Sequence, residues 1–170
     1  MHRSLYEWTR DTVERHGLAE RSVLEVGSKN VNGTVRDWFR GAYLGVDIEQ
    51  GPCVDMIANG EDLPFPDNAY GVVVSSEMLE HCAHPWLAIN EMVRVCEPGG
   101  NVIVTARGYD ERGCWEVHSY PYDYWRFGEH TIPLMLSDAG ALTVESVKDP
   151  EGPGWFVVGW KPTPVDEMPA

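Results

Sequence analysis

Apolar residues along the chain gather in short runs that alternate with longer, amphipathic segments. Two of the runs, VVVSS at residues 72–76 and VIVTA at residues 102–106, indicate strands buried on both faces. Such strands are typical of a mostly parallel sheet that is covered by helices. The pattern predicts seven strands, at residues 22–26, 43–47, 54–57, 70–75, 101–106, 142–148 and 155–161.

The amphipathic segments predict helices between these strands and before the first of them. The first helix ends near Gly17, and its apolar face carries Leu5, Trp8, Thr12 and Val13. The clearest later helices carry Trp86, Ile89, Val93 and Cys96, and then Ile132, Met135, Leu136 and Ala139. The last two strands are joined by turn residues at 149–154, which predicts an antiparallel hairpin.

The segment VLEVGSKNVNG at residues 23–33 predicts a site for a nucleotide-type cofactor at a strand-to-helix turn. Gly27 and Gly33 permit a tight turn and a close approach of the backbone. Asp47 ends the next apolar run, where an acid can accept hydrogen bonds from ribose hydroxyls. The ExGxxxxxG spacing differs from GxGxxG, which favours a nucleoside attached to an amino acid over a dinucleotide. The alternative is that both residues are ordinary loop glycines.

Composition narrows the class of protein. The 170 residues fit a single domain over residues 1–161, followed by a disordered tail at 162–170. The formal net charge of −14 argues against a nucleic-acid partner, because no cluster of Lys and Arg could neutralise phosphates. No segment is long and apolar enough for a signal peptide or a membrane span, so we expect a cytoplasmic protein without a membrane partner.

The cysteines and histidines give little support for a metal centre. The four cysteines show no CxxC spacing, which fits scattered reduced thiols. His81, Cys82 and His84 lie close together, but no second pair of ligands with matching spacing follows, so we expect no bound metal.

The order of motifs resembles the class I S-adenosylmethionine-dependent methyltransferases, in particular the methyltransferase type eleven group. The resemblance runs from Val23 to about Trp160. It rests on VLEVGSKNVNG, YLGVDIE at 43–49, NGEDLPF at 59–65, YGVVVSSEMLEH at 70–81, and EPGG at 97–100 before NVIVTA. It implies a Rossmann-like α/β fold and S-adenosyl-L-methionine as the cofactor.

The resemblance also implies roles for single residues. Asp47 would hold both ribose hydroxyls, and the groups around Gly27 would hold the methionyl end. Asn59, where the family more often has Asp, would face the adenine amine, and the backbone of Gly60 would face a ring nitrogen. Met78 would help to line the sulfonium pocket. The expected cofactor-binding residues are Glu25, Gly27, Ser28, Gly33, Asp47, Ile48, Asn59, Gly60, Glu61, Ser76 and Glu77.

The aromatic segment RGYDERGCWEVHSYPYDYWRFGEH at residues 107–130 is the expected acceptor-binding segment. Its HxYPxDYWRF string at 118–127 is similar to one found in members of the group. The aromatic rings would form a flat pocket for a sugar, a ring or an acyl chain, and the guanidinium of Arg126 would pair with an anionic group. The alternatives are that the rings only pack on the core and that Arg126 pairs with an internal acid. The expected acceptor-binding residues are Tyr120, Tyr124, Trp125 and Arg126.

Methyl transfer is a direct displacement that needs orientation, exclusion of water and, for a hydroxyl acceptor, a base. His118 is the first candidate for the base and His81 the second, with Asp123 as the further titratable group near the cleft. The alternative for His81 is a hydrogen bond to a loop carbonyl. We expect an enzyme that methylates a small-molecule or carbohydrate-like acceptor. The competing hypothesis is a non-catalytic, cofactor-binding partner subunit.

Overall fold

One sheet of seven strands organises the part of the chain that the structure describes. The structure, a computed structural model, describes residues 3–109 and 122–164. The strands are β1 (Val23–Val26), β2 (Tyr43–Asp47), β3 (Met56–Ile57), β4 (Tyr70–Ser76), β5 (Cys96–Arg107), β6 (Leu142–Lys148) and β7 (Gly154–Trp160). Their order is β3-β2-β1-β4-β5-β7-β6. β1 to β5 pair in parallel, and β7 runs antiparallel to both β5 and β6.

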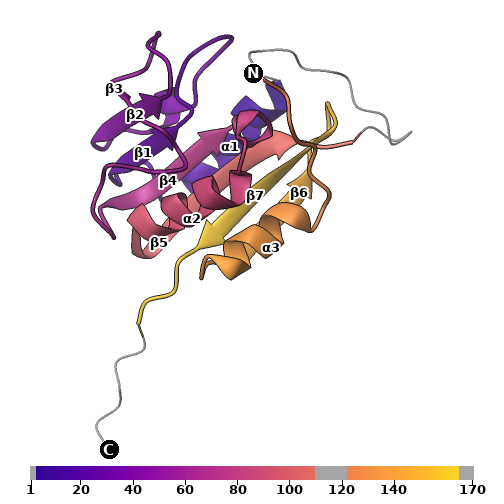
Figure 1. The fold of residues 1–170 in the computed structure, drawn as a ribbon. Helices are drawn as coiled ribbons and strands as arrows, with labels where there is room; N and C mark the ends of the chain where they lie inside the picture. The colour runs from indigo at the N-terminus through magenta and orange to yellow at the C-terminus, as the bar shows by residue number, and fades with distance from the viewer. Residues whose placement is uncertain (1–2, 110–121, 165–170) are drawn as a thin grey trace, which may run out of the picture.

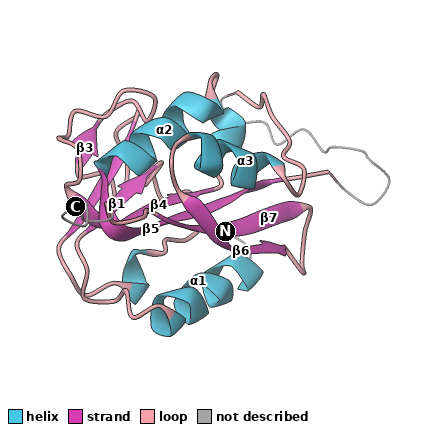
Figure 2. Cartoon of the chain, turned by 90° about the horizontal axis from the view of Figure 1, so that it is seen from below, coloured by secondary structure: helices cyan, strands magenta, loops and turns pink. Residues whose placement is uncertain are grey.

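Helices cover both faces of this sheet, which confirms the predicted fold class. Helix α1 (Arg3–Arg15) lies on one face, and α2 (Pro85–Val95) and α3 (Thr131–Asp138) lie on the other (Figure 1, Figure 2). Val72 and Val74 of β4 belong to the apolar cluster that contains Leu5 of α1, whereas Val73 belongs to the cluster of Ile89 and α3. The alternation of side chains along a strand places successive valines in opposite cores. Each fully buried valine contributes roughly 1.5–3 kcal/mol.

The strand order reverses at β1, and this reversal locates the expected site. From β1 the chain first builds β2 and β3 on one side and then returns to place β4 on the other side. Because these strands are parallel, their carboxyl ends meet at the same edge of the sheet. In open α/β sheets, ligands bind outside the carboxyl ends of the strands at such a switch point. The segments that follow Val26, Asp47 and Ser76 therefore converge there.

The connection from β1 to β2 differs from the expected strand-to-helix turn. It contains no α-helix, and its helical turn is the three-residue 3-10 helix η1 (Arg36–Trp38). Early in the connection the side chain of Asn30 accepts a hydrogen bond from Gly33 N–H at 2.8 Å, which stabilises a turn in place of a first helical turn. Val35 and Phe39 are the buried apolar residues of this stretch, too few for an amphipathic helical face.

Two further findings concern the chain as a whole. None of the helices in residues 3–109 and 122–164 combines the length and the apolar composition that crossing a bilayer requires. The division into a domain at 1–161 and a tail at 162–170 stays a prediction, and residues 165–170 lie outside the described part.

Candidate functional site

The glycine turn after β1 is built by backbone hydrogen bonds to β2. Gly27 adopts φ 83°, a left-handed conformation that favours glycine. The N–H groups of Gly27 and Ser28 both donate to the carbonyl of Val46, at 2.9 and 3.0 Å. A Cβ added at Gly27 would stand 2.6 Å from Cβ of Met78. Glycine is therefore required at position 27 for two reasons: the left-handed backbone conformation, and the space that the Met78 side chain occupies.

A second glycine turn, after β3, lies against the same end of β1. A Cβ added at Gly60 would stand 2.8 Å from Val26 Cγ1 and 3.7 Å from Met78 Cε. The side chain of Asn59 accepts a hydrogen bond from Glu61 N–H at 3.0 Å, which fixes the turn. The Met78 side chain thus extends from the first glycine to the second. The structure brings together the two turns that the sequence predicted to hold opposite ends of one ligand.

Asp47 connects the first turn to the end of β2. Its carboxylate accepts hydrogen bonds from Lys29 N–H at 3.0 Å and from Glu49 N–H at 3.1 Å, one on each oxygen. Because a carboxylate oxygen has two lone pairs, both oxygens retain capacity to accept hydrogen bonds from a ligand. Ile48, next along the chain, exposes 61% of its surface beside this carboxylate. Gly33 adopts φ 138° and is held by Asn30.

Glu25 occupies the opposite side of β1 from Val26 and is buried. Tyr43 Oη donates a hydrogen bond to its Oε2 at 2.9 Å. Burial raises the pKa of Glu25 to about 7, although the hydrogen bond from Tyr43 and the charge of Arg36 lower it. The carboxyl group is therefore engaged with β2, and the structure does not bring it together with Gly60 and Met78.

Three hydroxyl groups in this region have no hydrogen-bond partner. The Oγ atoms of Ser28, Ser75 and Ser76 are buried and unpaired among the described residues. Ser28 follows the glycine turn, and the other two end β4. Buried polar atoms without partners are rare in folded proteins and call for an explanation such as a ligand. Their position at the switch point fits a polar ligand there.

The segment after β4 carries two carboxyl groups, one partly buried and one fully buried. Glu77 adopts φ 52°, its N–H donates to the carbonyl of Thr105 at 3.0 Å, and its carboxylate pairs with Arg107 at 3.2 Å. Glu80 is fully buried, and neither of its carboxylate oxygens has a hydrogen-bond partner among the described residues. Burial raises the pKa of both groups. Glu80 lies in the 3-10 helix η2 (Leu79–His81), which turns the chain toward α2.

His81 and Glu61 have intramolecular partners. His81 Nδ1 contacts the carbonyl of Tyr122, which is the loop contact that the sequence left as an alternative to a base. The Glu61 carboxylate accepts hydrogen bonds from the backbone N–H of His84 and from its ring, both at 3.0 Å. Although burial opposes it, these bonds lower the pKa of Glu61. Cys82 Sγ contacts Met78, so His81, Cys82 and His84 face different partners.

The structure describes residues 107–109 and 122–130 of the acceptor segment, so the predicted residues His118 and Tyr120 lie outside the described residues. The N–H groups of Tyr124 and Trp125 donate to the carbonyl of Glu80, at 2.8 and 3.3 Å. Arg126 pairs with both carboxylate oxygens of Asp123, and the two side chains expose only 3% and 6% of their surface. The guanidinium predicted for an anionic acceptor thus has an internal acid as its partner.

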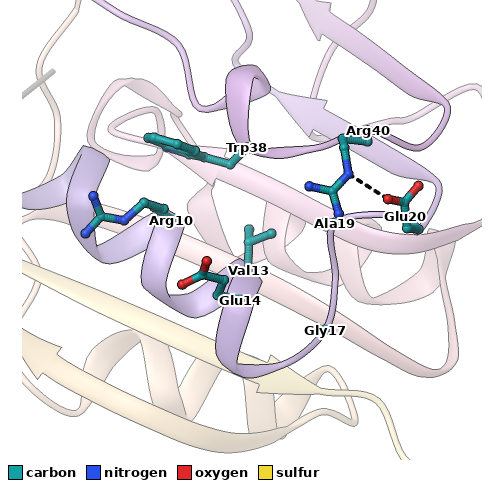
Figure 3. Close-up of a pocket in the computed structure, with 8 residues that line it drawn as sticks. All are labelled: Arg10, Val13, Glu14, Gly17, Ala19, Glu20, Trp38 and Arg40. Carbon is teal, nitrogen blue, oxygen red and sulfur yellow. Dashed lines mark hydrogen bonds and ion pairs between the residues drawn. The ribbon is translucent and has the colours of Figure 1, made fainter.

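A pocket of about 430 Å³ lies elsewhere on the molecule (Figure 3). It is lined by Arg10, Val13 and Glu14 of α1 and by residues near the start of β1 and β2, among them the paired Glu20 and Arg40. None of the predicted site residues that the structure describes lines it. We place the candidate site at the carboxyl ends of the strands, because the two glycine turns, Asp47 and the hydroxyls without partners among the described residues lie there.

Two side chains of the site have positions that the sequence did not predict. Met78 was expected in the sulfonium pocket, but not as the side chain that spans the two glycine turns. Trp86 was assigned to the core face of its helix, yet it exposes 42% of its surface and contacts Trp125. Its position directly after Pro85, in the first turn of α2, is the signal that would have placed it at the rim.

Comparison with known proteins connects this geometry to a family. Residues 24–104 match the model of a family described as a methyltransferase domain. An uncharacterized methyltransferase of Mycobacterium sp. (strain JLS) is 46% identical over 96 residues, which cover 50% of this chain and 38% of that protein. The chain thus accounts for well under half of that relative.

Two solved structures share the fold across most of the chain. The 1,6-didemethyltoxoflavin-N1-methyltransferase of Burkholderia thailandensis, with bound 1,6-didemethyltoxoflavin and S-adenosylhomocysteine, has a TM-score of 0.76 and 14% identity over 93% of this chain and 78% of that one. The [4+2]-cyclase SpnF has a TM-score of 0.74 and 18% identity, over 93% and 82%. The segment from residue 24 to residue 104 therefore matches a methyltransferase-domain family, and the chain shares the fold of these two structures.

Proposed function

We propose that this protein transfers a methyl group from S-adenosyl-L-methionine to a small-molecule or carbohydrate-like acceptor. The observation that carries the proposal is the meeting of two glycine turns, Asp47 and three hydroxyl groups without partners among the described residues, at the switch point of a segment that matches a methyltransferase-domain family. A non-catalytic, cofactor-binding subunit is the less favoured alternative, because the relatives are named as methyltransferases.

The residues present fit the cofactor. Asp47 is held by two backbone N–H groups and retains lone pairs for ribose hydroxyls. Ser28 and Ser76 offer buried donors that nothing in the described residues accepts, and these would meet the polar methionyl end. Gly60 lacks the Cβ that would meet Val26 and Met78, and Met78 would provide an apolar surface for the adenine ring. The chemistry supplied by the cofactor is an electrophilic methyl group on a sulfonium.

The chain itself would contribute positioning and exclusion of water. Segment 122–127 is fastened to η2 by the hydrogen bonds to Glu80, so acceptor and donor sites are joined by backbone contacts. His118 stays our first candidate for a general base. Contact with the carbonyl of Tyr122 makes His81 the weaker candidate, and the pairing of Asp123 with Arg126 gives that carboxylate a structural partner.

The fold alone does not decide the reaction, since one structural neighbour is named as a cyclase. The proposal is tested by titration calorimetry with S-adenosylhomocysteine, followed by incubation with S-adenosylmethionine and a library of small acceptors. Formation of S-adenosylhomocysteine that depends on an acceptor supports the enzyme. Binding without turnover on any acceptor supports the partner subunit, and absence of binding by folded protein overturns both.

Acceptor-dependent activity then permits a test of the base. His118→Ala should cut turnover of a hydroxyl acceptor about a hundredfold and leave cofactor affinity nearly unchanged. His81→Ala serves as the comparison. Equal turnover of parent and His118→Ala would remove His118 from the mechanism.

A further inference from the structure

An exposed group of aromatic side chains borders the candidate site. Trp86 of α2 and Trp125 of the acceptor segment meet at a centroid distance of 5.9 Å with their rings 78° apart. His84 meets Trp86 in a similar way, at 5.5 Å and 72°. Trp86 and Trp125 expose 42% and 37% of their surface. We call the near-perpendicular pair Trp86 and Trp125 the tryptophan corner.

The tryptophan corner is held in place by the segment after β4 and, through His84, by the Gly60 turn. Trp125 Nε1 donates to the carbonyl of Ala83, and the backbone of Trp125 donates to the carbonyl of Glu80 after β4. His84, which contacts Trp86, is bonded to Glu61 beside the Gly60 turn. The corner is therefore a prearranged surface at the rim of the site.

The charge of this edge of the sheet selects the kind of group that would occupy the corner. Between residues 41 and 93, which include β2, β3, β4 and the loops that follow them, the chain has no Lys or Arg. The same stretch has nine acids, and the six at or after the carboxyl ends of β2, β3 and β4 are Asp47, Glu49, Glu61, Asp62, Glu77 and Glu80. Lys29 after β1 and Arg107 at the end of β5 pair with two of these acids, Glu49 and Glu77. An acidic edge attracts cations and repels anions. Arg126, the cation nearest to the corner in the chain, is paired with Asp123.

From these observations we propose that the tryptophan corner receives the ammonium group of an amine acceptor. Faces of indole rings attract cations placed within about 6 Å of the ring centre, and tryptophan is the best aromatic partner for such a group. Two indoles at a steep angle offer two faces to one cation. The inference rests on the proposed function and adds to it the class of acceptor, a small amine.

The transfer of a methyl group to an amine acceptor conserves atoms and charge. The nitrogen first releases one proton to water and then attacks the methyl carbon with its lone pair, so that the N–C bond forms as the C–S bond breaks. The sulfur keeps the electron pair of that bond and becomes neutral, and the positive charge passes to the methylated nitrogen. The corner would hold the cationic group before the proton leaves and after the methyl arrives.

The test uses choline as a cationic probe and 3,3-dimethylbutan-1-ol as its neutral equivalent of the same shape. Binding to the full chain is followed by NMR of the tryptophan indole N–H signals, assigned with the variants. We expect choline to bind at least about tenfold more tightly than the neutral probe and to shift the Trp86 and Trp125 signals. Trp86→Leu should weaken choline binding by about tenfold, whereas Trp86→Phe keeps most of it.

Leu87→Ala is the matched control, because Leu87 is an exposed apolar neighbour of Trp86 without a π-face, and choline affinity should not change. Equal binding of the two probes, unchanged binding by Trp86→Leu, or preferential binding of benzenesulfonate overturns the proposal. S-adenosylhomocysteine binding is measured on the same samples. If the parent protein binds S-adenosylhomocysteine but not choline, only the amine acceptor is refuted. If the folded parent protein does not bind S-adenosylhomocysteine, the proposed function is refuted.

Discussion

Gly27 and Met78 share one volume at the carboxyl end of β1. A Cβ at Gly27 would stand 2.6 Å from Cβ of Met78, close to the Met78 backbone, where the side chain cannot swing away. The Met78 side chain then continues to Gly60. The shape of the candidate donor site therefore depends on Met78, whose side chain lies between Gly27 and Gly60.

Gly27→Ala should destabilise the fold and weaken cofactor binding. The substitution imposes a left-handed backbone on alanine, which costs about 1–2 kcal/mol, and it adds overpacking against Met78 of about 1–3 kcal/mol. Gly140→Ala is the control, since Gly140 has φ 90° and nothing within 4 Å of an added Cβ. Urea unfolding should give a larger loss of unfolding free energy for Gly27→Ala than for Gly140→Ala. Equal losses would mean that Met78 makes no tight contact.

Asp47→Asn should weaken binding of S-adenosylhomocysteine by about tenfold or more, or roughly 1.4 kcal/mol. An amide offers one acceptor oxygen in place of two, so one of the N–H groups of Lys29 and Glu49 loses its partner. Asp55→Asn is the matched control, because Asp55 also accepts a backbone hydrogen bond, from Gly45 at 2.8 Å, in the next loop. Calorimetry on both variants separates a ligand contact from loss of loop structure. Equal affinities for the two variants would argue against a ribose contact.

Glu25→Gln should change the dependence of stability on pH. Burial raises the pKa of Glu25 in the folded protein from 4.5 to about 7. Between these values the folded state binds more protons than the unfolded state, so this group's contribution to stability is present below pH 4.5 and is lost as pH rises past 7. The neutral glutamine removes that loss and still accepts the hydrogen bond from Tyr43. At pH 8 the variant should be more stable than the parent, by an amount on the order of 2 kcal/mol.

The measurement is urea unfolding at pH 5 and pH 8. In Glu25→Gln the unfolding free energy should change less between the two pH values than in the parent. Some change should remain, because burial also raises the pKa of Glu77 and Glu80. Glu129→Gln, an exposed residue, provides the control. An identical difference between the two pH values in parent and Glu25→Gln would contradict the assignment.

Asp123→Ala should cost about 3–5 kcal/mol, because it leaves the guanidinium of Arg126 buried without its principal partner. Replacing both residues, by Asp123→Leu with Arg126→Met, should recover most of that loss. Thermal unfolding of Asp123→Leu, Arg126→Met and the double variant gives the coupling between the two residues. Additive effects would mean that the pair does not act as a unit.

The spacing of apolar residues predicted most of the helices and strands. Where a predicted strand differs from the structure, local contacts explain the difference. The run predicted at residues 54–57 forms a strand only at Met56–Ile57, since Cys53 takes a left-handed conformation and Asp55 turns its carboxylate to Gly45 N–H. β5 begins at Cys96, before the predicted start at 101, because Cys96 already pairs with Tyr70 ahead of a bulge. Such strand boundaries depend on the residues with which the strand pairs. A local run of residues does not reveal those partners.

The sequence predicted less of the candidate site than of the fold. Spacing pointed to the turn at Gly27 and to Asp47, because those positions have conformational or charge requirements, and the resemblance to the family pointed to Gly60. It did not reveal that Glu25 bonds to Tyr43, that Arg126 pairs with Asp123, or that Trp86 faces outward. These outcomes depend on which side chains the fold brings within reach, and the roles predicted for the site residues stay predictions.

The missing helix after β1 has a kinetic consequence. Residues 27–34 are held by hydrogen bonds to β2 and to neighbouring loops, such as those from Lys29 to Asp47 and from Asn30 to Pro52, in place of hydrogen bonds within a helix. A loop without helical hydrogen bonds opens more readily than a segment wound into a helix. The lifetime of a bound donor would then be governed by how often this stretch detaches, and amide exchange at Lys29 and Asn30 would slow when the donor is present.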